Sequence, residues 1–501
     1  MNSREQPSAE AVLTAAFCDE SALSRPLCID LDGSLITSDT LWESVLLLIR
    51  QKPWLMLLVP FWLFGGRARF KRAVARNAEL DPTALPYRRD LVAALRATHA
   101  RGRKLVLATA ADRAVADGVA RHLGFFDAVH ASDGQQNLKA KHKRDLLLAS
   151  YGEGGFDYVG DSSADRPIFE AATRGYLVGA STMAVRAARG LEQVTLSSLR
   201  PDWRRALIRE LRPHQWAKNA LILLPLALAP AFDADQLVAS LLALSTFCLC
   251  ASAGYVFNDL IDVEADRSHA SKYRRPFASG DLPVIAGPPL FVGLLVVAFA
   301  LSLSLLPLGS TVMLALYFVG TVSYSLYWKR LLLLDVLVLA GLYTHRILSG
   351  GIATHVPVSA WLLGFSMFFF TSLAFAKRYI ELRALTHQTQ VKNRGYFRSD
   401  LEMVTSMGTA SGYIAALVFV LYVDSTAVRA TYREPRLLWL VLPVLLYWLG
   451  RIWMLAGRGQ VQEDPVKFAL KDRHSFLAGA IVFGIVLIAR FAPDWLSTAL
   501  P

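Results

Sequence analysis

Charged residues are scarce in this chain. Only 19% of its 501 residues are Asp, Glu, Lys or Arg, whereas 54% are hydrophobic. Soluble domains carry about 25% charged residues, so this composition excludes a soluble enzyme built on one core, and equally a disordered or collagen-like chain. The four cysteines (Cys18, Cys28, Cys248 and Cys250) are scattered and mostly lie in apolar runs, which argues against a disulfide framework.

A secretory signal is also missing, because residues 1–20 lack a basic start followed by an apolar core. We therefore expect the N-terminus to stay in the cytoplasm. Acidic residues are outnumbered, with 41 Asp and Glu against 53 Lys and Arg. In an apolar chain this excess marks the cytoplasmic side of a membrane protein, so we expect a membrane as partner and no nucleic acid.

Hydropathy divides the chain near residue 200. The first part, 25–200, alternates short apolar runs such as 26–31 and 104–108 with charged amphipathic stretches. This pattern predicts an α/β domain with a parallel sheet. The second part, 201–501, consists of long apolar runs separated by charged loops, which predicts an all-α polytopic membrane domain.

We predict nine membrane spans, although the first is shorter than the roughly 20 residues that a span needs, which leaves a count of eight open. They are 219–232, 237–257, 284–306, 309–327, 331–350, 358–376, 405–423, 436–455 and 474–491. The loops on the side of the N-terminal half carry 17 Lys and Arg, and the opposite loops carry three. The positive-inside rule therefore predicts that the N-terminal half and these basic loops are cytoplasmic, in the plasma membrane.

A further apolar stretch, 54–64, lies inside the α/β half and is too short to span a bilayer. Basic residues follow it, namely Arg67, Arg69, Lys71 and Arg72. The stretch therefore fits a helix that lies in the headgroup region and holds the domain on the membrane. An ordinary buried helix is the alternative.

The α/β half contains a set of residues suited to phosphoryl transfer. Asp30 and Asp32 directly follow an apolar run, so both carboxylates can emerge together at the end of a strand. One can attack phosphorus while the other protonates the leaving oxygen. Thr109 closes the next apolar run, and its hydroxyl can hold a phosphate oxygen.

Two more motifs complete this set. Lys143 opens a helix and can neutralise phosphate, and the stretch 160–165 supplies Asp161 and Asp165, whose carboxylates suit Mg²⁺. A single DxD motif is more often a loop than an active site, but four motifs in this order are a strong signal. Over about 25–200 they resemble the haloacid dehalogenase (HAD) phosphohydrolase superfamily.

The resemblance implies a Rossmann-like sheet with a cap formed by residues 39–100, Asp30 as nucleophile and Asp32 as acid/base. It also implies Mg²⁺ held by Asp30, Asp161 and the Leu31 carbonyl, with Asp165 in support. Ser34 replaces the commoner Thr, and Lys139 and Lys141 compete with Lys143 for the role of the motif lysine. An inert scaffold is the alternative to an active phosphatase.

The membrane half carries carboxylates at the end of the second span. Asp259, Asp262 and Asp266 have the spacing i, i+3, i+7, which predicts that they share one helix face. Three carboxylates near lipid repel one another, and a divalent cation that bridges them to a diphosphate removes this cost. A solvated acidic helix end is the alternative.

Other polar residues are predicted at the same membrane face. Intramembrane charges are functional by default, although Asp335 and Arg346 also fit a structural pairing role. The candidates for substrate binding are Lys218, Asn258, Arg275, Tyr324, Lys329, Arg346, Lys377 and Arg378.

The motif NDLIDVEAD at 258–266, the stretch RPHQWAKN at 212–219 and the series of spans resemble the UbiA prenyltransferase superfamily over about 205–495. Aromatic prenyltransferases of that superfamily carry a second aspartate-rich motif after the sixth span, where this chain reads KRYIEL at 377–382. These stretches and those at 324–336 and 464–473 resemble the decaprenyl-phosphate phosphoribosyltransferase branch of the superfamily.

That branch implies transfer of phosphoribose from phosphoribosyl diphosphate to a polyprenyl phosphate, with Mg²⁺ on Asp259, Asp262 and Asp266. The basic motif is chemically consistent, because Lys and Arg can hold the phosphates that the acidic motif does not. The rivals are prenyl transfer from an allylic diphosphate to an aromatic acceptor, and a lipid-phosphate binding or transport module with an inert HAD scaffold. We expect the HAD domain to remove the 5-phosphate of the product. The sequence leaves open whether the protein is a homo-oligomer.

Overall fold

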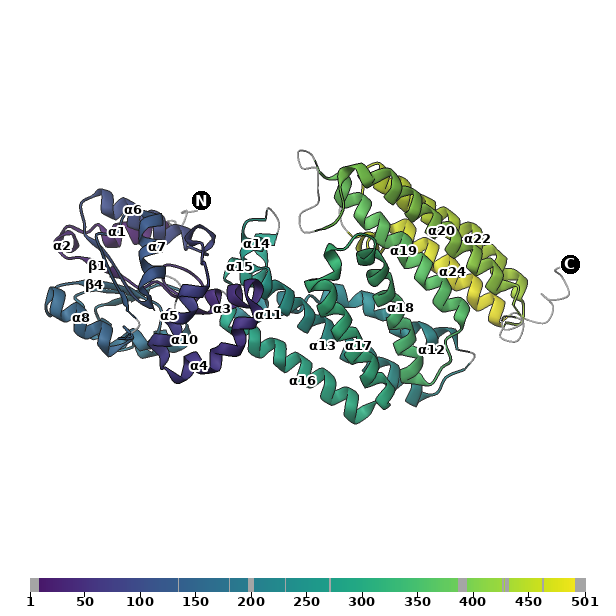
Figure 1. The fold of residues 1–501 in the computed structure, drawn as a ribbon, viewed down its shortest axis with the longest axis horizontal. Coiled ribbons are helices and arrows are strands. Elements are labelled where there is room, and N and C mark those ends of the chain that lie inside the picture. Colours follow the sequence, from purple (N-terminus) through teal and green to yellow (C-terminus); the bar gives the residue numbers. More distant parts are fainter. Residues whose placement is uncertain are drawn as a thin grey trace, which may run out of the picture. The chain divides into compact units, whose positions relative to one another are not determined.

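The computed structural model describes residues 9–133, 135–179, 181–196, 202–229, 231–269, 272–385, 394–425, 428, 432–461 and 464–491. The chain divides into two compact units, one of Met1–Arg212 with Tyr255–Val292 and one of Pro213–Gly254 with Gly293–Pro501 (Figure 1). The predicted boundary between residues 200 and 201 lies outside the described residues. The first unit includes the segment with the acidic motif, which the sequence had grouped with the membrane domain.

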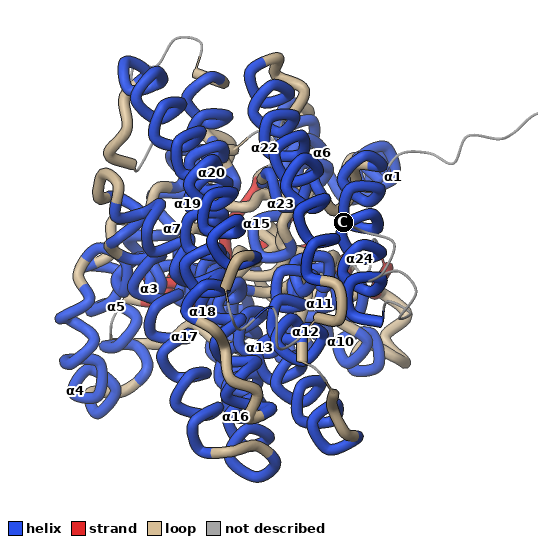
Figure 2. Tube along the Cα trace, turned by 90° about the vertical axis from the view of Figure 1, so that its right-hand side faces the viewer, coloured by secondary structure: helices blue, strands red, loops and turns tan. Residues whose placement is uncertain are grey.

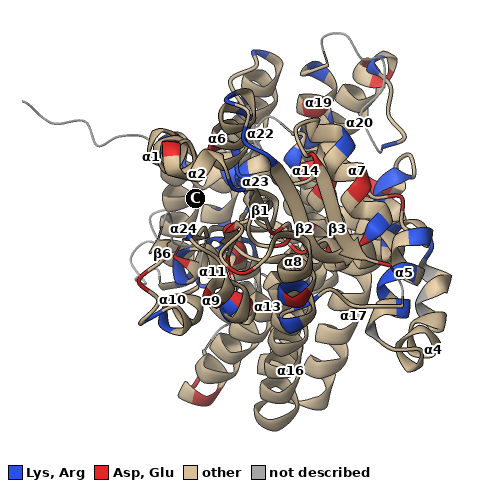
Figure 3. Ribbon diagram, turned by 90° about the vertical axis from the view of Figure 1, so that its left-hand side faces the viewer, with Lys and Arg blue, Asp and Glu red and all other residues tan. Residues whose placement is uncertain are grey.

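Eight helices in the described part of the chain are long and apolar enough to cross a membrane. Five of them are single α-helices: α13 Ala234–Ile261, α17 Leu308–Leu326, α18 Leu334–Thr354, α19 Ala360–Arg383 and α24 Arg473–Phe491. The other three, Val284–Leu305, Arg398–Val423 and Pro435–Gly457, begin with a 3₁₀ turn and continue as α16 Gly287–Leu305, α20 Leu401–Val423 and α22 Val441–Gly457. They coincide with eight of the nine predicted spans. Figure 2 shows α19, α20 and α22 side by side, and α16 and α17 contain no charged residue (Figure 3).

The first predicted span, 219–232, does not form one long helix. Its residues belong to the 3₁₀ helix η4 Pro213–Leu223 and the five-residue helix α12 Leu224–Leu228. Pro225 lies in the first turn of α12, where its missing N–H does not cost a helical hydrogen bond. The count of nine spans is therefore not confirmed.

Close helix packing in the second unit depends on a glycine. A methyl group at Gly408 of α20 would lie 2.3 Å from Trp453 of α22 and 2.7 Å from Phe375 of α19. Both distances are far shorter than a van der Waals contact, so a larger side chain here would push the three helices apart.

The first unit is built on a six-stranded parallel sheet with the order β3-β2-β1-β4-β5-β6. The strands are β1 Leu27–Ile29, β2 Leu105–Asp112, β3 Ala128–Ser132, β4 Asp157–Gly160, β5 Gly175–Leu177 and β6 Val194–Leu196. The prediction of an α/β domain with a parallel sheet is confirmed.

Alternation along the strands produces a core on each face of the sheet. Leu27 and Ile29 point to one face and Cys28 points to the other, as the two-residue period of a strand requires. The first face is covered by α1 Ala9–Phe17, α6 Arg89–Ala100 and α7 Arg113–Leu123. The second is covered by α8 Lys141–Tyr151, α9 Arg166–Ala171 and α10 Thr182–Ala187. Both faces are apolar because both are covered.

The segment between β1 and β2 does not lie wholly outside the core of the sheet. It contains α3 Thr40–Gln51, η1 Pro53–Leu58, α4 Val59–Phe64, α5 Arg67–Asn77, η2 Pro82–Ala84 and then α6. However, Leu91, Ala94 and Leu95 of α6 are buried in the core of the sheet. The predicted cap of 39–100 was therefore too long, because an amphipathic helix covers the sheet as readily as it builds a cap.

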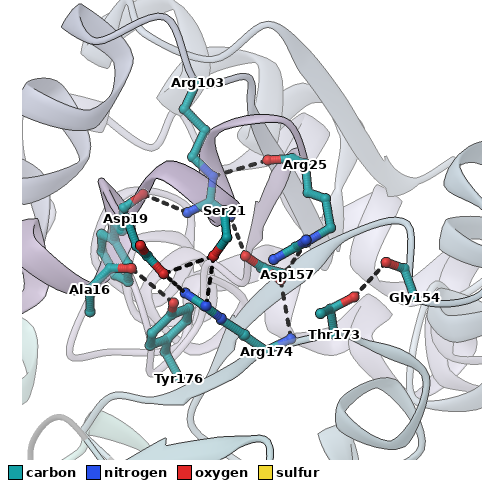
Figure 4. A network of polar contacts seen from close by, with 11 residues as sticks. Ala16, Asp19, Ser21, Arg25, Arg103, Gly154, Asp157, Thr173, Arg174 and Tyr176 are labelled. Carbon is teal, nitrogen blue, oxygen red and sulfur yellow. Dashed lines mark hydrogen bonds and ion pairs between the residues drawn. The ribbon is translucent and has the colours of Figure 1, made fainter.

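A buried ion pair ties strands together at the end of the sheet opposite Asp30 (Figure 4). Arg103 and Asp157 are paired, and both side chains are fully buried. Arg103 also donates to the carbonyls of Phe17 (2.8 Å) and Arg25 (3.0 Å), and Asp157 accepts from the Arg174 backbone N–H (3.1 Å). These bonds satisfy both charges inside the protein.

We expect Asp157→Ala to lower the free energy of unfolding of this unit by about 3–5 kcal/mol, because Arg103 would be left buried without its carboxylate. Cys28 is fully buried in the sheet, so its labelling by maleimide on heating reports unfolding. Asp145→Ala is the matched control, since that carboxylate is 59% exposed. If Cys28 becomes labelled at the same temperature in both variants, the pair of Arg103 and Asp157 does not contribute to the free energy of unfolding.

Candidate active sites

Carboxylates meet at the carboxyl ends of β1 and β4, which are adjacent parallel strands. Asp30 follows β1, and Asp161 and Asp165 follow β4. One ligand oxygen from each of these three buried residues lies within 4.8 Å of the other two. Carboxylate oxygens are hard ligands of the kind that Mg²⁺ prefers, so these residues fit the predicted metal. In the described part of the chain, no other group of His, Cys, Asp and Glu has this spacing.

Lys143 is brought to the same site from α8. Its ammonium lies 2.8 Å from Asp30 Oδ1 and 3.9 Å from Asp165 Oδ1, and it donates to the Tyr158 hydroxyl at 3.0 Å. Lys143 is buried, whereas Lys139 and Lys141 are exposed. Of the three candidate lysines, Lys143 is therefore the one that reaches the carboxylates.

The two aspartates of the DxD motif have different environments. Burial raises the pKa of Asp30 to about 6, although the ammonium of Lys143 opposes this effect. Burial, with repulsion from Asp39, raises the pKa of Asp32 to about 8, while Asp32 accepts the Thr40 N–H at 2.8 Å. The pKa of Asp32 is thus raised further than that of Asp30, so Asp32 is the carboxyl of the two that more readily holds a proton.

Gly33 explains why the motif reads DxDG. Its φ is +80°, and a Cβ on it would lie 2.2 Å from Asp161 Oδ2. Only glycine lets the loop approach Asp161 this closely in this conformation. The glycine of the DxDG motif therefore marks the place where the loop after β1 meets the loop after β4 that carries Asp161.

A small pocket lies beside Asp32, and Lys71 of α5 lines it. Lys71 Nζ donates to the Ala110 carbonyl at 2.6 Å, and burial lowers the pKa of Lys71. The sequence pointed to Lys71 only as one of the basic residues after the apolar stretch. Thr109, predicted as a phosphate ligand, is buried in β2, and its hydroxyl accepts the Ala111 N–H at 3.0 Å.

The acidic motif of the membrane half is interrupted. Helix α13 ends at Ile261, and α14 Val263–Arg267 begins after Asp262, whose φ and ψ (−96°, 9°) are not helical. The helix predicted through the motif is therefore interrupted at Asp262, but Asp259 and Asp266 still face the same arginine, Arg275. The i→i+4 bonds continue on both sides, because Asp262 N–H donates to the Asn258 carbonyl and Asp266 N–H to the Asp262 carbonyl (2.9 and 2.8 Å).

Arginines neutralise this motif. Arg275 Nη1 lies 3.0 Å from Asp259 Oδ1 and 2.5 Å from Asp266 Oδ2, and Arg212 also pairs with Asp259. Asp259 and Asp266 are both buried. Their carboxylates have the right chemistry for Mg²⁺, but in this arrangement they bind guanidinium groups, so a metal would have to displace these contacts.

Glu210 of α11 Trp203–Leu211 is a further carboxylate near this motif. It is fully buried, and burial together with repulsion from Asp259 raises its pKa to about 8. Neither Glu210 nor Arg212 was among the predicted site residues. The signal for Arg212 was present, since it opens the RPHQWAKN stretch, whereas Glu210 two residues earlier had no motif to mark it.

A buried ion pair connects the segment of the acidic motif to the α/β part. Arg267 Nη2 of α14 lies 2.6 Å from Glu43 Oε1 of α3, and Glu43 also accepts from the Ser38 hydroxyl. The partners are 224 residues apart in sequence, so no local pattern could have predicted this contact.

In the second unit, two predicted lysines meet at one carboxylate. Lys218 Nζ of η4 and Lys377 Nζ of α19 each lie 3.2 Å from Asp464 Oδ2. Burial alone would raise the pKa of Asp464, but the two ammonium groups hold it well below its usual range. Two cations share one anion, so the cluster keeps a net positive charge that suits phosphate.

Arg378 has a different environment from its neighbour Lys377. It is buried, its Nε lies 2.9 Å from Asp335 Oδ2, and it also pairs with Glu381. Tyr396 donates to Asp335 at 2.7 Å, and the Tyr324 hydroxyl accepts from Arg378 at 3.5 Å. Arg378 and Asp335 therefore form part of the packing that shapes this region.

Two further candidates, Arg346 and Lys329, have separate surroundings. Arg346 donates to Asn219 Oδ1 at 2.8 Å and to the Tyr317 hydroxyl at 2.9 Å, so it links η4, α17 and α18. This is the structural pairing role that the sequence left open. Lys329 is half-buried in η7 Trp328–Arg330.

Comparison with known proteins places these sites in context. Residues 220–488 match the model of the UbiA prenyltransferase family. Uncharacterized protein y4nM of Sinorhizobium fredii is 37% identical over 471 residues, which cover 93% of this chain and 91% of that protein. This similarity extends across both the α/β part and the membrane helices.

Two other relatives are similar over about half of this chain. Nodulation protein NoeC of Azorhizobium caulinodans is 34% identical over 284 residues, covering 55% of this chain and 89% of that protein. Decaprenyl-phosphate phosphoribosyltransferase of Mycolicibacterium smegmatis is 30% identical over 277 residues, covering 53% of this chain and 86% of that protein.

Proposed function

Because this chain belongs to the UbiA prenyltransferase family, we propose that its membrane half transfers phosphoribose from phosphoribosyl diphosphate to a polyprenyl phosphate such as decaprenyl phosphate. The similarity to decaprenyl-phosphate phosphoribosyltransferase supports this branch of the family. The observation that carries the proposal is the cluster of Lys218 and Lys377 on Asp464, at the end of α19 where a second acidic motif would be expected in an aromatic prenyltransferase.

The charge at this position distinguishes the two reactions. An allylic diphosphate is one anionic group, which two acidic motifs hold through Mg²⁺. Phosphoribosyl diphosphate and a lipid phosphate bring two additional phosphates, and a positively charged cluster suits these. We assign Lys218 and Lys377 to direct phosphate binding, and Tyr324, Lys329 and Arg378 to positioning the substrates around them.

The acidic motif would hold the diphosphate. Asp259, Asp262 and Asp266 would bind Mg²⁺, which stabilises negative charge on a leaving diphosphate. Arg212 and Arg275, which neutralise the carboxylates in the structure, would then be available for phosphate oxygens. An oxygen of the lipid phosphate would attack the anomeric carbon of the ribose as the bond to diphosphate breaks. The lipid phosphate is already an anion, so no protein base is needed.

We propose that the α/β part is a HAD-type phosphatase that removes the 5-phosphate from this product. Asp30 would attack phosphorus, and the bond to the ribose O5 would break as Asp32 protonates that oxygen. Water would then hydrolyse the aspartyl phosphate to inorganic phosphate. The order of pKa values, with Asp32 above Asp30, supports these two roles.

We further propose that both sites lie at the cytoplasmic face of the plasma membrane, as the distribution of Lys and Arg among the loops indicates. A phosphatase on the same chain would meet its lipid-borne substrate at a high effective concentration.

A donor comparison tests the transferase proposal. The purified chain is supplied with decaprenyl phosphate and radiolabelled phosphoribosyl diphosphate, or with a radiolabelled allylic diphosphate and an aromatic acceptor. We expect a labelled lipid only from the first pair of substrates. A labelled product formed only from the allylic diphosphate would show that the chain catalyses prenyl transfer and would contradict phosphoribosyl transfer.

We expect Lys377→Ala to weaken the use of phosphoribosyl diphosphate by about 1.5–3 kcal/mol, the scale of a lost charge-assisted hydrogen bond. Asp464 would keep Lys218 as a partner, so folding should be preserved. Arg378→Ala should cause a similar loss, but it also leaves Asp335 without its partner, so Lys377 gives the cleaner test. Steady-state kinetics against donor concentration measures the effect. The exposed Lys471 provides the control variant Lys471→Ala, and an equal apparent affinity for both would remove Lys377 from the site.

A further inference from the structure

Residues 53–64 present an apolar surface to the outside of the first unit. In η1 and α4 the side chains of Leu57, Phe61 and Phe64 are 78%, 70% and 90% exposed. Trp54, Leu58 and Leu63 are also exposed. Isolated exposed apolar residues are common, but six of them in eleven positions form a contiguous feature of the kind that contacts a partner.

The segment is held by its other side. Leu55 and Trp62 pack against the small core of Leu47, Leu48 and Ala78. The segment therefore has an inner face that fixes it to α3 and α5 and an outer face of large apolar side chains. A segment that had merely come loose from the core would not separate its residues in this way.

Charge around the segment points to an anionic partner. Between residues 44 and 78 there are seven Lys and Arg and no Asp or Glu. Figure 3 shows α4 without charged residues and α5 beside it with Lys and Arg. An apolar face of Trp, Phe and Leu flanked by cations is typical of elements that lie in the headgroup region of an anionic bilayer.

The position of the segment within the first unit agrees with this partner. Helix α3 leads into the segment and packs against η6 Val284–Ala286. This 3₁₀ helix is the first turn of the membrane span Val284–Leu305. The buried pair of Arg267 and Glu43 holds α3 in this place. The segment therefore follows a helix that is fixed next to the start of a span.

We propose that residues 53–64 insert into the headgroup region of an anionic lipid bilayer and hold the α/β part on the membrane. The segment is too short to cross the bilayer, and its apolar face would be buried to a depth of about 5–10 Å. This inference does not depend on the reaction that either half catalyses.

Fluorescence of the full chain in lipid nanodiscs tests this proposal. Phe61→Cys and Phe64→Cys are each labelled with the polarity-sensitive fluorophore NBD. All four native cysteines are buried, so the new thiol is the reactive one. The matched control is Glu153→Cys in the exposed loop before β4. The nanodiscs contain phosphatidylcholine or phosphatidylglycerol, with or without doxyl quenchers on the acyl chains.

We expect blue-shifted NBD emission at positions 61 and 64. Doxyl lipids should lower the emission intensity about twofold, as for residues at the boundary of headgroups and acyl chains. The loss should be larger in phosphatidylglycerol, and the label at 153 should remain in a water-like environment. If the labels at positions 61 and 64 show the same emission and the same lack of quenching as the label at 153, the proposal is overturned. Blue-shifted emission without quenching by lipid, with self-quenching between labelled copies, would also overturn it in favour of an interface between two chains.

Discussion

We expect Asp259→Asn and Asp262→Asn each to lower transferase turnover by about 100-fold or more, the scale of losing one electrostatic stabiliser of a transition state. Each substitution keeps the size of the side chain and removes its charge. An amide is a far weaker ligand for Mg²⁺ than a carboxylate, so the leaving diphosphate would lose its stabilisation. Turnover with saturating phosphoribosyl diphosphate and Mg²⁺ measures the effect.

Glu264→Gln is the matched control for these variants. Glu264 lies on α14 between the motif residues, and its side chain is 37% exposed and 3.6 Å from Arg50. It should retain activity. Thermal unfolding in detergent separates a catalytic defect from misfolding. Asp262→Asn should unfold like Glu264→Gln, whereas Asp259→Asn should lose some stability, because the buried Asp259 carboxylate pairs with Arg212 and Arg275. Near-wild-type turnover of Asp259→Asn or Asp262→Asn at saturating Mg²⁺ would show that the metal assignment is wrong.

Asp30→Asn should stop dephosphorylation and leave transfer intact. We expect the variant to accumulate polyprenyl-phosphate 5-phosphoribose, whereas the wild type yields polyprenyl-phosphate ribose and inorganic phosphate. The loss of phosphate release should be about three orders of magnitude or more, because the residue that forms the covalent intermediate is gone. Mass spectrometry of the lipids and a phosphate assay report the two products separately.

The exposed Asp145 supplies the control variant Asp145→Asn, which should dephosphorylate normally. Formation of the same phosphorylated lipid by wild type and Asp30→Asn, with no phosphate release from either, would assign the α/β part another substrate or a scaffold role. Transfer itself should be unchanged in Asp30→Asn, so this outcome would leave the transferase proposal standing.

The sequence by itself determined the features that depend on neighbouring residues. Hydropathy located eight spans, with an error of at most about seven residues at an end, because the preference of a helix for lipid is the sum over its own side chains. Apolar runs located β1 and β2, and the DxDG motif located the edge of the sheet where the carboxylates meet. In each case the information lies within about twenty residues of chain.

Helix ends and short helices were harder to predict from such local information. The cap was predicted as too long because α6 has the same amphipathic pattern whether it covers a sheet or a cap. The sequence left open whether the short stretch 219–232 is a span, and it did not indicate the interruption at Asp262, for a related reason. A break in a helix depends on what packs around it, which periodicity does not record.

Only the tertiary structure decided which charges meet. It brought Lys143 rather than Lys139 or Lys141 to Asp30, and it joined Lys218 and Lys377 at Asp464 across 246 and 87 residues of chain. It also paired Arg212 and Arg275 with Asp259. The physical reason is that a buried charge needs an opposite charge within about 4 Å, and which one lies there depends on how distant segments pack.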